Sequence, residues 1–332
     1  MDPLSQGLLG ASLPQSISNK KSLGIIGLLG FLSGMAPDLD IFIRSDSDPL
    51  LFLEFHRQFT HSLIFIPIGG IICAIFLYHL ISKRCKVSFK DTWIYSTLGY
   101  ATHGLLDACT SYGTLLFWPF SQTRIAWNNI SIIDPLFTVP LLILVLLAII
   151  KQKKIFSIIA LVWAISYLLL GVYQKNEALI AGKTIAKNRG HDLIRIDVKP
   201  SLGNLLLWKT IYETQDKFYV DAVRLGWKPK IFEGESIGKI DIQSSFPWLI
   251  LGSEQAKDIK RFNWFSNGYI AVNPENKNQI IDIRYSSIPN KIGGLWGIEL
   301  NEKKANKEHV DWVTKRTVSK NNFKILKEML FY

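Results

Sequence analysis

The sequence predicts an α-helical multi-pass membrane domain of about five helices, followed by a soluble, mixed α+β domain that is rich in strands. Charge divides the chain first: residues 1–173 hold 12 Lys+Arg and 9 Asp+Glu, whereas residues 174–332 hold 26 and 18. The apolar stretches of the first half are close to the roughly 20 residues that cross a bilayer core. We therefore predict a transmembrane domain over 1–173 and a soluble domain over 174–332.

Two of the five apolar stretches, Ser62–Ser82 and Ile155–Tyr173, are close to 20 residues long and carry no formal charge when His79 is neutral, and these two favour a membrane protein most strongly. The first stretch is short, and the third and fourth contain His103, Asp107 and Asp134, so these three would also fit buried helices of a soluble protein. The predicted spans are Ser22–Ala36, Ser62–Ser82, Thr92–Cys109, Ser131–Ile150 and Ile155–Tyr173.

The first stretch has an alternative interpretation as a cleaved signal peptide. Lys20 and Lys21 precede an apolar run that ends in Gly34-Met35-Ala36, which resembles such a peptide. The 19 residues before the lysines are long and apolar for a signal-peptide n-region. This favours an uncleaved first helix.

Basic residues in the links between the spans predict the orientation. Four lie in KRCKVSFK at 83–90, three lie in KQKK at 151–154, and Lys20 and Lys21 precede the first span. With five spans all of them fall on one side, which is the cytoplasmic side by the positive-inside rule. The segments 37–61, 110–130 and 174–332 are then extracytoplasmic, and the protein is expected in the cytoplasmic (inner) membrane.

The second half shows short β-type alternation between Gly, Pro and Asn, and we expect a helix at FKILKEMLFY. Its Lys and Arg residues alternate with Asp and Glu, which argues against direct nucleic-acid binding; an anionic membrane surface is an equally good partner. The three cysteines do not suggest a disulfide framework. The expected strands are DLIRIDV, KFYVDAV, GYIAV and QIIDIRYSS.

Acidic residues, histidines and arginines gather at the extracytoplasmic ends of four predicted spans. His103 and Asp107 are spaced i, i+4 and share a helix face. Imidazole and carboxylate groups are preferred ligands of zinc and similar ions, and a metal ion with an open position can activate water. Arginine suits a phosphate group. The candidate metal ligands are Asp38, Asp40, His56, His61, His103 and Asp107, and the candidate catalytic residues are Arg57, Arg124 and Asp134.

Each candidate also has a structural interpretation. Asp38 or Asp40 alone could serve a turn or a helix cap, and Asp134 could simply start a helix before Pro135. His56 and His61 are five residues apart, so they share no face of a regular helix. His79 and His191 are not expected to be ligands.

The motifs MDPLSQGLLGA, PDLD, HRQFTHS, HGLLDACTSYGT, FWPFS and IIDPLFT resemble, in order, the YdjM-type family of inner-membrane proteins. That family is described as metal-dependent hydrolases, and its name also links it with LexA binding. It is similar, more distantly, to zinc-dependent phospholipase C-like proteins, which bind zinc through His and Asp. The resemblance implies zinc ligands at the HxxxD pair His103 and Asp107. This chain has Ser5-Gln6 where some relatives carry Thr-His.

Together these observations favour a metal-dependent hydrolase that uses zinc, or manganese, to cleave a phosphoester or related bond in a lipid or envelope molecule. Arg57 and Arg124 would clamp the anionic group, and Asp134 would orient a ligand or act as general base. A non-catalytic metal- or lipid-binding membrane scaffold is the alternative. A transporter is less well supported, because polar residues at mid-membrane depth in two matching halves are not evident.

Overall fold

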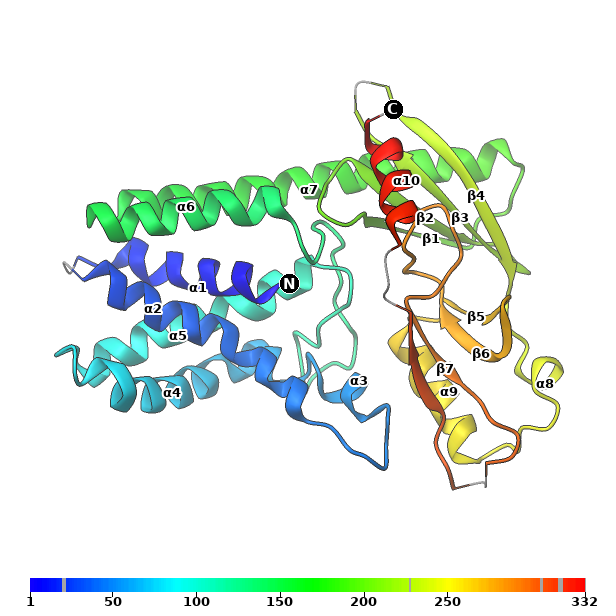
Figure 1. Ribbon diagram of the computed structural model, residues 1–332, viewed down its shortest axis with the longest axis horizontal. Coiled ribbons are helices and arrows are strands. Elements are labelled where there is room, and N and C mark those ends of the chain that lie inside the picture. Colours follow the sequence, from blue (N-terminus) through cyan, green and yellow to red (C-terminus); the bar gives the residue numbers. More distant parts are fainter. Residues whose placement is uncertain (20–21, 227, 305–306, 316–318, 332) are drawn as a thin grey trace. The chain divides into compact units, whose positions relative to one another are not determined.

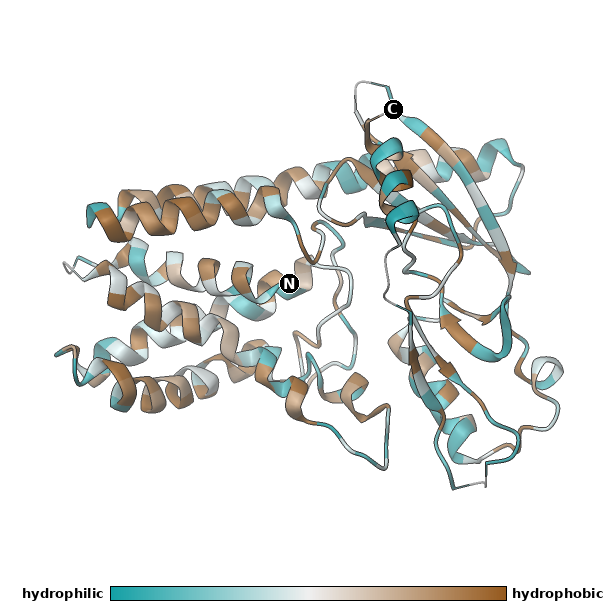
Figure 2. Ribbon diagram, viewed as in Figure 1, coloured by the Kyte–Doolittle hydropathy of each residue, from teal (hydrophilic) through white to brown (hydrophobic). Residues whose placement is uncertain are grey.

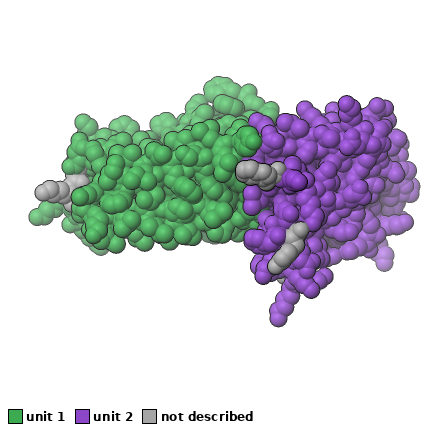
Figure 3. Space-filling model, turned by 90° about the horizontal axis from the view of Figure 1, so that it is seen from above, with its two compact units in different colours: residues 1–42, 55–173, 202–205 green, residues 43–54, 174–201, 206–332 purple. Residues whose placement is uncertain are grey.

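The computed structural model describes every residue except 20–21, 227, 305–306, 316–318 and 332. The chain divides into two compact units, which Figure 3 shows in two colours. Unit 1 comprises Met1–Phe42, Phe55–Tyr173 and Leu202–Leu205. Unit 2 comprises Ile43–Glu54, Gln174–Ser201 and Leu206–Tyr332. The short segment Ile43–Glu54 therefore interrupts the first unit in sequence and belongs to the second.

Unit 1 is helical, as predicted, and each of the five expected apolar stretches contains a helix (Figure 1). The helix α1 was not predicted; it packs on α2, α5 and α6. The principal helices are α1 (Pro3–Ile17), α2 (Leu23–Met35), α4 (Ile66–Leu77), α5 (Phe89–Cys109), α6 (Pro135–Lys151) and α7 (Ile155–Asn188), and the last continues into unit 2.

Glycines let three of these helices approach one another backbone to backbone. A Cβ at Gly30 of α2 would overlap the carbonyl oxygen of Gly10 on α1. A Cβ at Gly99 of α5 would overlap the backbone of Gly30. Gly30 and Gly34 form a GxxxG pattern, which is typical of close helix pairs in membranes. The residues that follow Gly34 are thereby held close to the C-terminal half of α5.

Three segments of the described chain are long and apolar enough to cross a membrane: Leu23–Phe42, Leu63–Ser82 and Ile155–Asn188. The helix α6 is apolar but shorter. Figure 2 shows the apolar character of α2, α4, α6 and the first half of α7. The third predicted span corresponds to α5, which buries polar groups such as Thr92, Ser96 and Thr102. These buried polar side chains lower the hydropathy of α5, so the number of spans that length and composition support is smaller than five.

The links at 83–90 and 151–154 lie at the same end of unit 1 (Figure 1). Lys154 Nζ donates to Asn19 Oδ1 at 2.6 Å, and Leu23 N donates to Gln152 Oε1 at 3.3 Å. Lys20 and Lys21 lie outside the described residues. At the opposite ends of the helices, Asp2 N donates to the carbonyl oxygen of Ile132 at 2.9 Å. The N-terminus of α1, the C-terminus of α5 and the start of α6 therefore share the other end, where the candidate ligands are found.

Unit 2 contains two antiparallel four-stranded sheets, which confirms the strand-rich second half. Buried residues of both sheets form one core, which includes Ile211, Val220, Ala271 and Ile281. The first sheet has the order β1 (Arg195–Pro200), β2 (Leu207–Glu213), β3 (Lys217–Arg224) and β4 (Lys230–Gly238). The second has the order β5 (Ile270–Asn273), β6 (Asn276–Asp282), β7 (Trp296–Glu299) and β8 (Asp311–Thr314).

Each expected strand overlaps one of these eight, although β6 ends at Asp282 and does not extend through QIIDIRYSS. The expected C-terminal helix is α10 (Lys320–Phe331). Helix α9 (Glu254–Phe265) was not predicted; its hydrophobic face buries Ile259, Phe262 and Phe265.

Candidate metal centre

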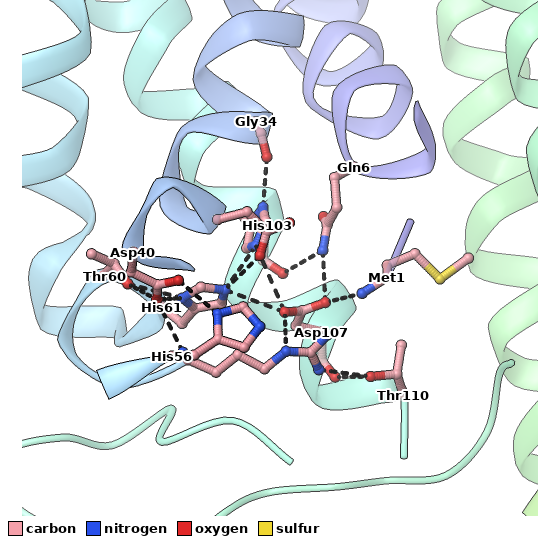
Figure 4. A network of polar contacts seen from close by, with 12 residues as sticks. Met1, Gln6, Gly34, Asp40, His56, Thr60, His61, His103, Asp107 and Thr110 are labelled. Carbon is pink, nitrogen blue, oxygen red and sulfur yellow. Dashed lines mark hydrogen bonds and ion pairs between the residues drawn. The ribbon is translucent and has the colours of Figure 1, made fainter. Parts of the chain in front are cut away.

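Four predicted ligands of unit 1 converge on one point, as Figure 4 shows for three that it labels. His61 Nε2 lies 2.9 Å from His103 Nε2, 3.4 Å from Asp38 Oδ1 and 3.3 Å from Asp107 Oδ2. His103 Nε2 lies 3.4 Å from Asp38 Oδ1 and 3.7 Å from Asp107 Oδ2. Two nitrogens and two oxygens thus lie close together, and we call the four residues Asp38, His61, His103 and Asp107 the donor set.

The spacing of these donors suits a metal ion. Four ligands at about 2.0 Å from a tetrahedral zinc ion lie about 3.3 Å from one another. The five separations above range from 2.9 to 3.7 Å. Asp107 Oδ2 is a buried oxygen that forms an ion pair with Arg57 but accepts no hydrogen bond from the described residues. It therefore retains a lone pair for a cation, so the four residues could bind a metal ion.

The tautomers of the two histidines strengthen this fit. His103 Nδ1 lies 2.6 Å from the carbonyl oxygen of Gly34, which can only accept, so Nδ1 carries the proton. Thr60 Oγ1 donates to Asp40 and lies 3.0 Å from His61 Nδ1, so it accepts from that nitrogen. In their neutral form both rings therefore direct an Nε2 lone pair at the same point.

The backbone brings the ligands together from three places. Asp38 lies in the 3₁₀ helix η1 (Ala36–Phe42), which continues α2, and His61 ends the 3₁₀ helix η2 (Phe59–His61). His103 and Asp107 are one turn apart on α5. A Cβ at Gly104 would overlap the carbonyl oxygen of His61, so glycine at this position allows η2 to approach α5.

Asp40 contacts the segment His56–His61, including the nitrogen of His61 that faces away from the donor set. Its Oδ2 is 3.2 Å from His61 Nδ1 and accepts from Arg57 N at 3.0 Å. Its Oδ1 is 2.7 Å from His56 Nδ1. A carboxylate that holds the far nitrogen of a ligating histidine fixes the ring orientation and raises its basicity. Asp38, Asp40 and His56 also form a second group that could hold an ion, and Asp38 belongs to both groups.

Arg57 supplies a buried positive charge at the same place. Its Nε lies 3.1 Å from Asp107 Oδ2, and its Nη1 donates to Thr110 Oγ1 at 3.2 Å. The backbone of Arg57 has a φ of 66°, a left-handed conformation that is uncommon outside glycine. The neighbouring His56 ring is partly exposed, and burial lowers its pKa below the usual value.

Several residues of the site were not predicted. Gln6 donates from Nε2 to Asp107 Oδ1 at 2.9 Å, and its buried Oε1 accepts no hydrogen bond from the described residues. The Met1 amino group also pairs with Asp107 Oδ1. The sequence signal for Gln6 was the departure at Ser5-Gln6 from the resembling family. Thr60 and Thr110 gave no signal of their own.

The other two predicted catalytic residues lie in different contacts. Asp134 caps α6 by accepting from Leu136 N, and its Oδ2 accepts from the hydroxyl of Tyr167 at 2.9 Å. Arg124 donates from Nη2 to the carbonyl oxygen of Gly113 at 2.9 Å. None of these contacts involves the donor set, and the roles of Asp134 and Arg124 stay predictions.

A third group of possible ligands, Asp48, Asp258 and His309, lies in unit 2. Arg261 already binds two of its members: Nη1 lies 2.9 Å from Asp48 Oδ1 and 2.9 Å from Asp258 Oδ1. Because a guanidinium group neutralises these carboxylates, the arrangement is explained as an ion-pair network.

Comparisons with known proteins identify the family. A family model described as "YdjM inner membrane protein" matches residues 1–178, which include every residue of the donor set. Over 98 residues the chain is 29% identical to "Inner membrane protein YbcI" of Escherichia coli (strain K12). This match covers 29% of the chain and 54% of YbcI, so the chain spans about half the length of this curated relative. No solved structure matches. Since the family model covers more than half of the 332 residues, the chain belongs to the YdjM inner membrane protein family.

Proposed function

We propose that this protein is a membrane-bound, metal-dependent hydrolase that cleaves a phosphoester or related bond in a lipid or envelope molecule. The observation that carries the proposal is the convergence of two imidazole lone pairs and two carboxylates on one buried point. Arg57 and the Met1 amino group balance the charge of Asp107 alone, so Asp38 and the two Nε2 atoms would still face one another with little hydration. A bound metal ion would remove that cost and could activate a water molecule for hydrolysis.

Zinc is the ion that we favour, with manganese as the alternative. Two nitrogen and two oxygen donors at tetrahedral spacing suit zinc, whereas manganese prefers more oxygen ligands in an octahedral arrangement. When bound, such an ion lowers the pKa of a coordinated water and polarises a phosphoryl oxygen. No nucleophilic Ser or Cys motif is evident in the sequence, so water is the natural attacking group.

The protein residues around the donor set have complementary roles in this proposal. The Asp38 side chain is 27% exposed, whereas those of His61, His103 and Asp107 are buried, so a substrate would approach from the Asp38 side. His56 is held by Asp40 through Nδ1, which leaves Nε2 as the nitrogen able to accept a proton from water. Arg57 would stabilise the anionic group. Arg124 and Asp134 are retained as further substrate-binding and general-base candidates.

The position of the site supports a bilayer-anchored substrate. The donor set is at the end of helices that include candidate membrane spans, so a molecule anchored in the bilayer can reach it without leaving the membrane. We further propose that this end is extracytoplasmic, because the basic links at 83–90 and 151–154 favour the cytoplasmic side.

A metal-binding scaffold without turnover is the second candidate. Four protein donors can fill a tetrahedral shell, as they do in structural zinc sites, whereas catalytic sites keep one position for water. The partial exposure of Asp38 favours the catalytic alternative, because a carboxylate at the rim can give up its position to water or substrate. The two candidates differ in turnover and agree on metal binding.

Metal content of the full-length, detergent-purified protein tests the proposal. We expect about one equivalent of zinc by mass spectrometry in the parent and its loss in His103→Ala/Asp107→Ala. His79→Ala is the matched control, since His79 lies in the helical segment Tyr78–Ser82, outside the donor set. A parent that binds neither zinc nor manganese after reconstitution would rule out the hydrolase proposal.

Turnover is measured with the zinc-loaded protein on bis(p-nitrophenyl) phosphate and on phospholipids in mixed micelles. Metal-dependent release of product that is lost in His103→Ala/Asp107→Ala supports a hydrolase. Stoichiometric zinc without hydrolysis of any phosphoester or lipid offered would favour the scaffold.

A further inference from the structure

We propose that Arg261 of unit 2 is a positioning residue for the metal centre, and that it acts through the segment Ile43–Glu54. This inference rests on the proposed metal binding but not on turnover. It assigns to the C-terminal domain a regulatory influence on ligand geometry in unit 1.

The first step is the position of this segment in the chain. It begins three residues after Asp40 and ends two residues before His56. Asp40 and His56 are joined at 2.7 Å, so they close a loop whose two ends carry site residues. The loop itself belongs to unit 2, whereas its ends belong to unit 1. Any displacement of the loop is therefore transmitted through the backbone to both site residues.

The second step is the set of contacts that fix the loop. Arg261 on α9 binds Asp48 in a bidentate manner, with Nη1–Oδ1 at 2.9 Å and Nη2–Oδ2 at 2.8 Å. Its Nε donates to Glu54 Oε1 at 2.6 Å. One guanidinium group thus holds the middle and the end of the loop. Bidentate arginine–carboxylate contacts add geometric specificity as well as energy.

The third step is the rigidity of Arg261 itself. Asp258, which is fully buried, accepts from Arg261 Nη1 at 2.9 Å and from Val310 N at 3.1 Å. The loop also packs by apolar contacts: Phe52 lies edge-on to Trp312 with ring centroids 5.1 Å apart, and Leu50 is buried. Arg261 is therefore held on the body of unit 2, and its contacts restrict the movement of the loop.

The consequence is an energetic coupling between the domain and the centre. Through Asp40, the loop end orients His61 Nδ1 and Arg57 N. Loss of partners that orient a ligating histidine costs 10–100-fold in metal affinity. We expect release of the loop to have an effect at the lower end of that range, because Arg261 acts through the backbone.

The zinc affinity of full-length protein, measured by chelator competition, is the first readout. We expect Arg261→Ala to weaken zinc binding about tenfold. Asp48→Asn/Glu54→Gln should weaken it to a similar extent, and adding both changes to Arg261→Ala should give no further loss. The control is Arg195→Ala, which removes another unit 2 arginine that contacts Glu213 and Asn267 and not the loop.

Hydrogen–deuterium exchange provides a readout that does not depend on metal. Arg261→Ala should speed exchange in residues 36–42 and 55–62, whereas Arg195→Ala should leave these peptides unchanged. Unchanged exchange and affinity in Arg261→Ala would overturn the coupling, as would an equal effect of Arg195→Ala. A metal-free parent would instead remove the proposed function, and the exchange experiment would still decide the coupling.

Discussion

His61 and His103 are 42 positions apart in the sequence, yet their Nε2 atoms lie 2.9 Å from each other. Both Nδ1 atoms are engaged elsewhere, that of His103 with the Gly34 carbonyl and that of His61 with Thr60 and Asp40. The helix α5 and the segment before α4 thus place the two Nε2 atoms face to face. Few arrangements other than a shared cation, either a proton or a metal ion, make this pair favourable.

Replacement of Asp40 by Asn tests the orienting role of this carboxylate. Asn keeps the size of the side chain but removes the charge that supports His61 Nδ1–H. We expect zinc affinity to fall 10–100-fold, whereas loss of His61 itself should abolish binding. Chelator competition measures the change, with the exposed Asp46→Asn as control. An affinity equal to that of the parent would mean that Asp40 does not support the ligand.

Gly104→Ala tests the close approach of η2 to α5. The added Cβ would overlap the His61 carbonyl oxygen, which is backbone and cannot move without moving the ligand. Overpacking of this kind costs about 1–3 kcal/mol, so we expect zinc affinity to fall about tenfold or more. Gly24→Ala is the control, because its Cβ would meet only Ile149 Cγ2 at 3.5 Å. Equal zinc binding in both variants would contradict the packing argument.

The four residues of the donor set were all among the predicted ligands, whereas surrounding residues such as Gln6 and Thr60 were not predicted. His103 and Asp107 were expected to act together because a helix places i and i+4 residues on one face. Asp38 and His61 come from irregular segments, and only the overall topology suggested that they share a membrane face. Their joint position depends on contacts such as Gly104 with His61, which no local pattern encodes.

Parts of the fold also depend on contacts that local sequence patterns do not encode. The helix α1 was not predicted as a helix, because its Ser, Gln and Gly residues give it low hydropathy; ten of its residues are nevertheless buried in unit 1. The assignment of Ile43–Glu54 to unit 2 was also unexpected. Arg261, which binds Asp48 of this segment, lies more than 200 positions away in the sequence. Long-range ion pairs of this kind leave no periodicity to detect.

Labelling of Cys85 tests the proposed orientation. Cys85 is exposed in the basic link between η4 (Tyr78–Ser82) and α5, and Cys109 is buried. We expect a membrane-impermeant maleimide to modify Cys85 in inside-out vesicles but not in intact spheroplasts, since positively charged links stay cytoplasmic. Asp46→Cys in a Cys85→Ser background should show the reverse pattern. Labelling of Cys85 from outside would place the metal centre on the cytoplasmic side.

The pH dependence of unit 2 stability provides a last test, through Lys209. This side chain is buried and donates from Nζ to Ser286 Oγ at 2.7 Å and to the Lys291 carbonyl oxygen at 3.0 Å. Burial lowers the pKa of Lys209 to about 7, from 10.5 in the unfolded chain. Between these values the unfolded state binds one more proton than the folded state, so stability rises with pH. The largest slope from this group is about 1.4 kcal/mol per pH unit.

The measurement compares the parent with Lys209→Met, which removes the titrating group and keeps an apolar stem of similar length. Groups that do not interact with Lys209 contribute equally to both proteins, and its partners Asp282 and Glu235 are carboxylates, which ordinarily titrate well below pH 7, so the difference between the two proteins above pH 7 reports mainly on Lys209. We expect the Tm of the strand signal in circular dichroism to rise more steeply between about pH 7 and pH 9 in the parent than in the variant. The exposed Lys277→Met should retain the slope of the parent. Parallel curves for the parent and Lys209→Met would show that Lys209 stays charged in the fold, and its environment would then have to contain compensating negative charge.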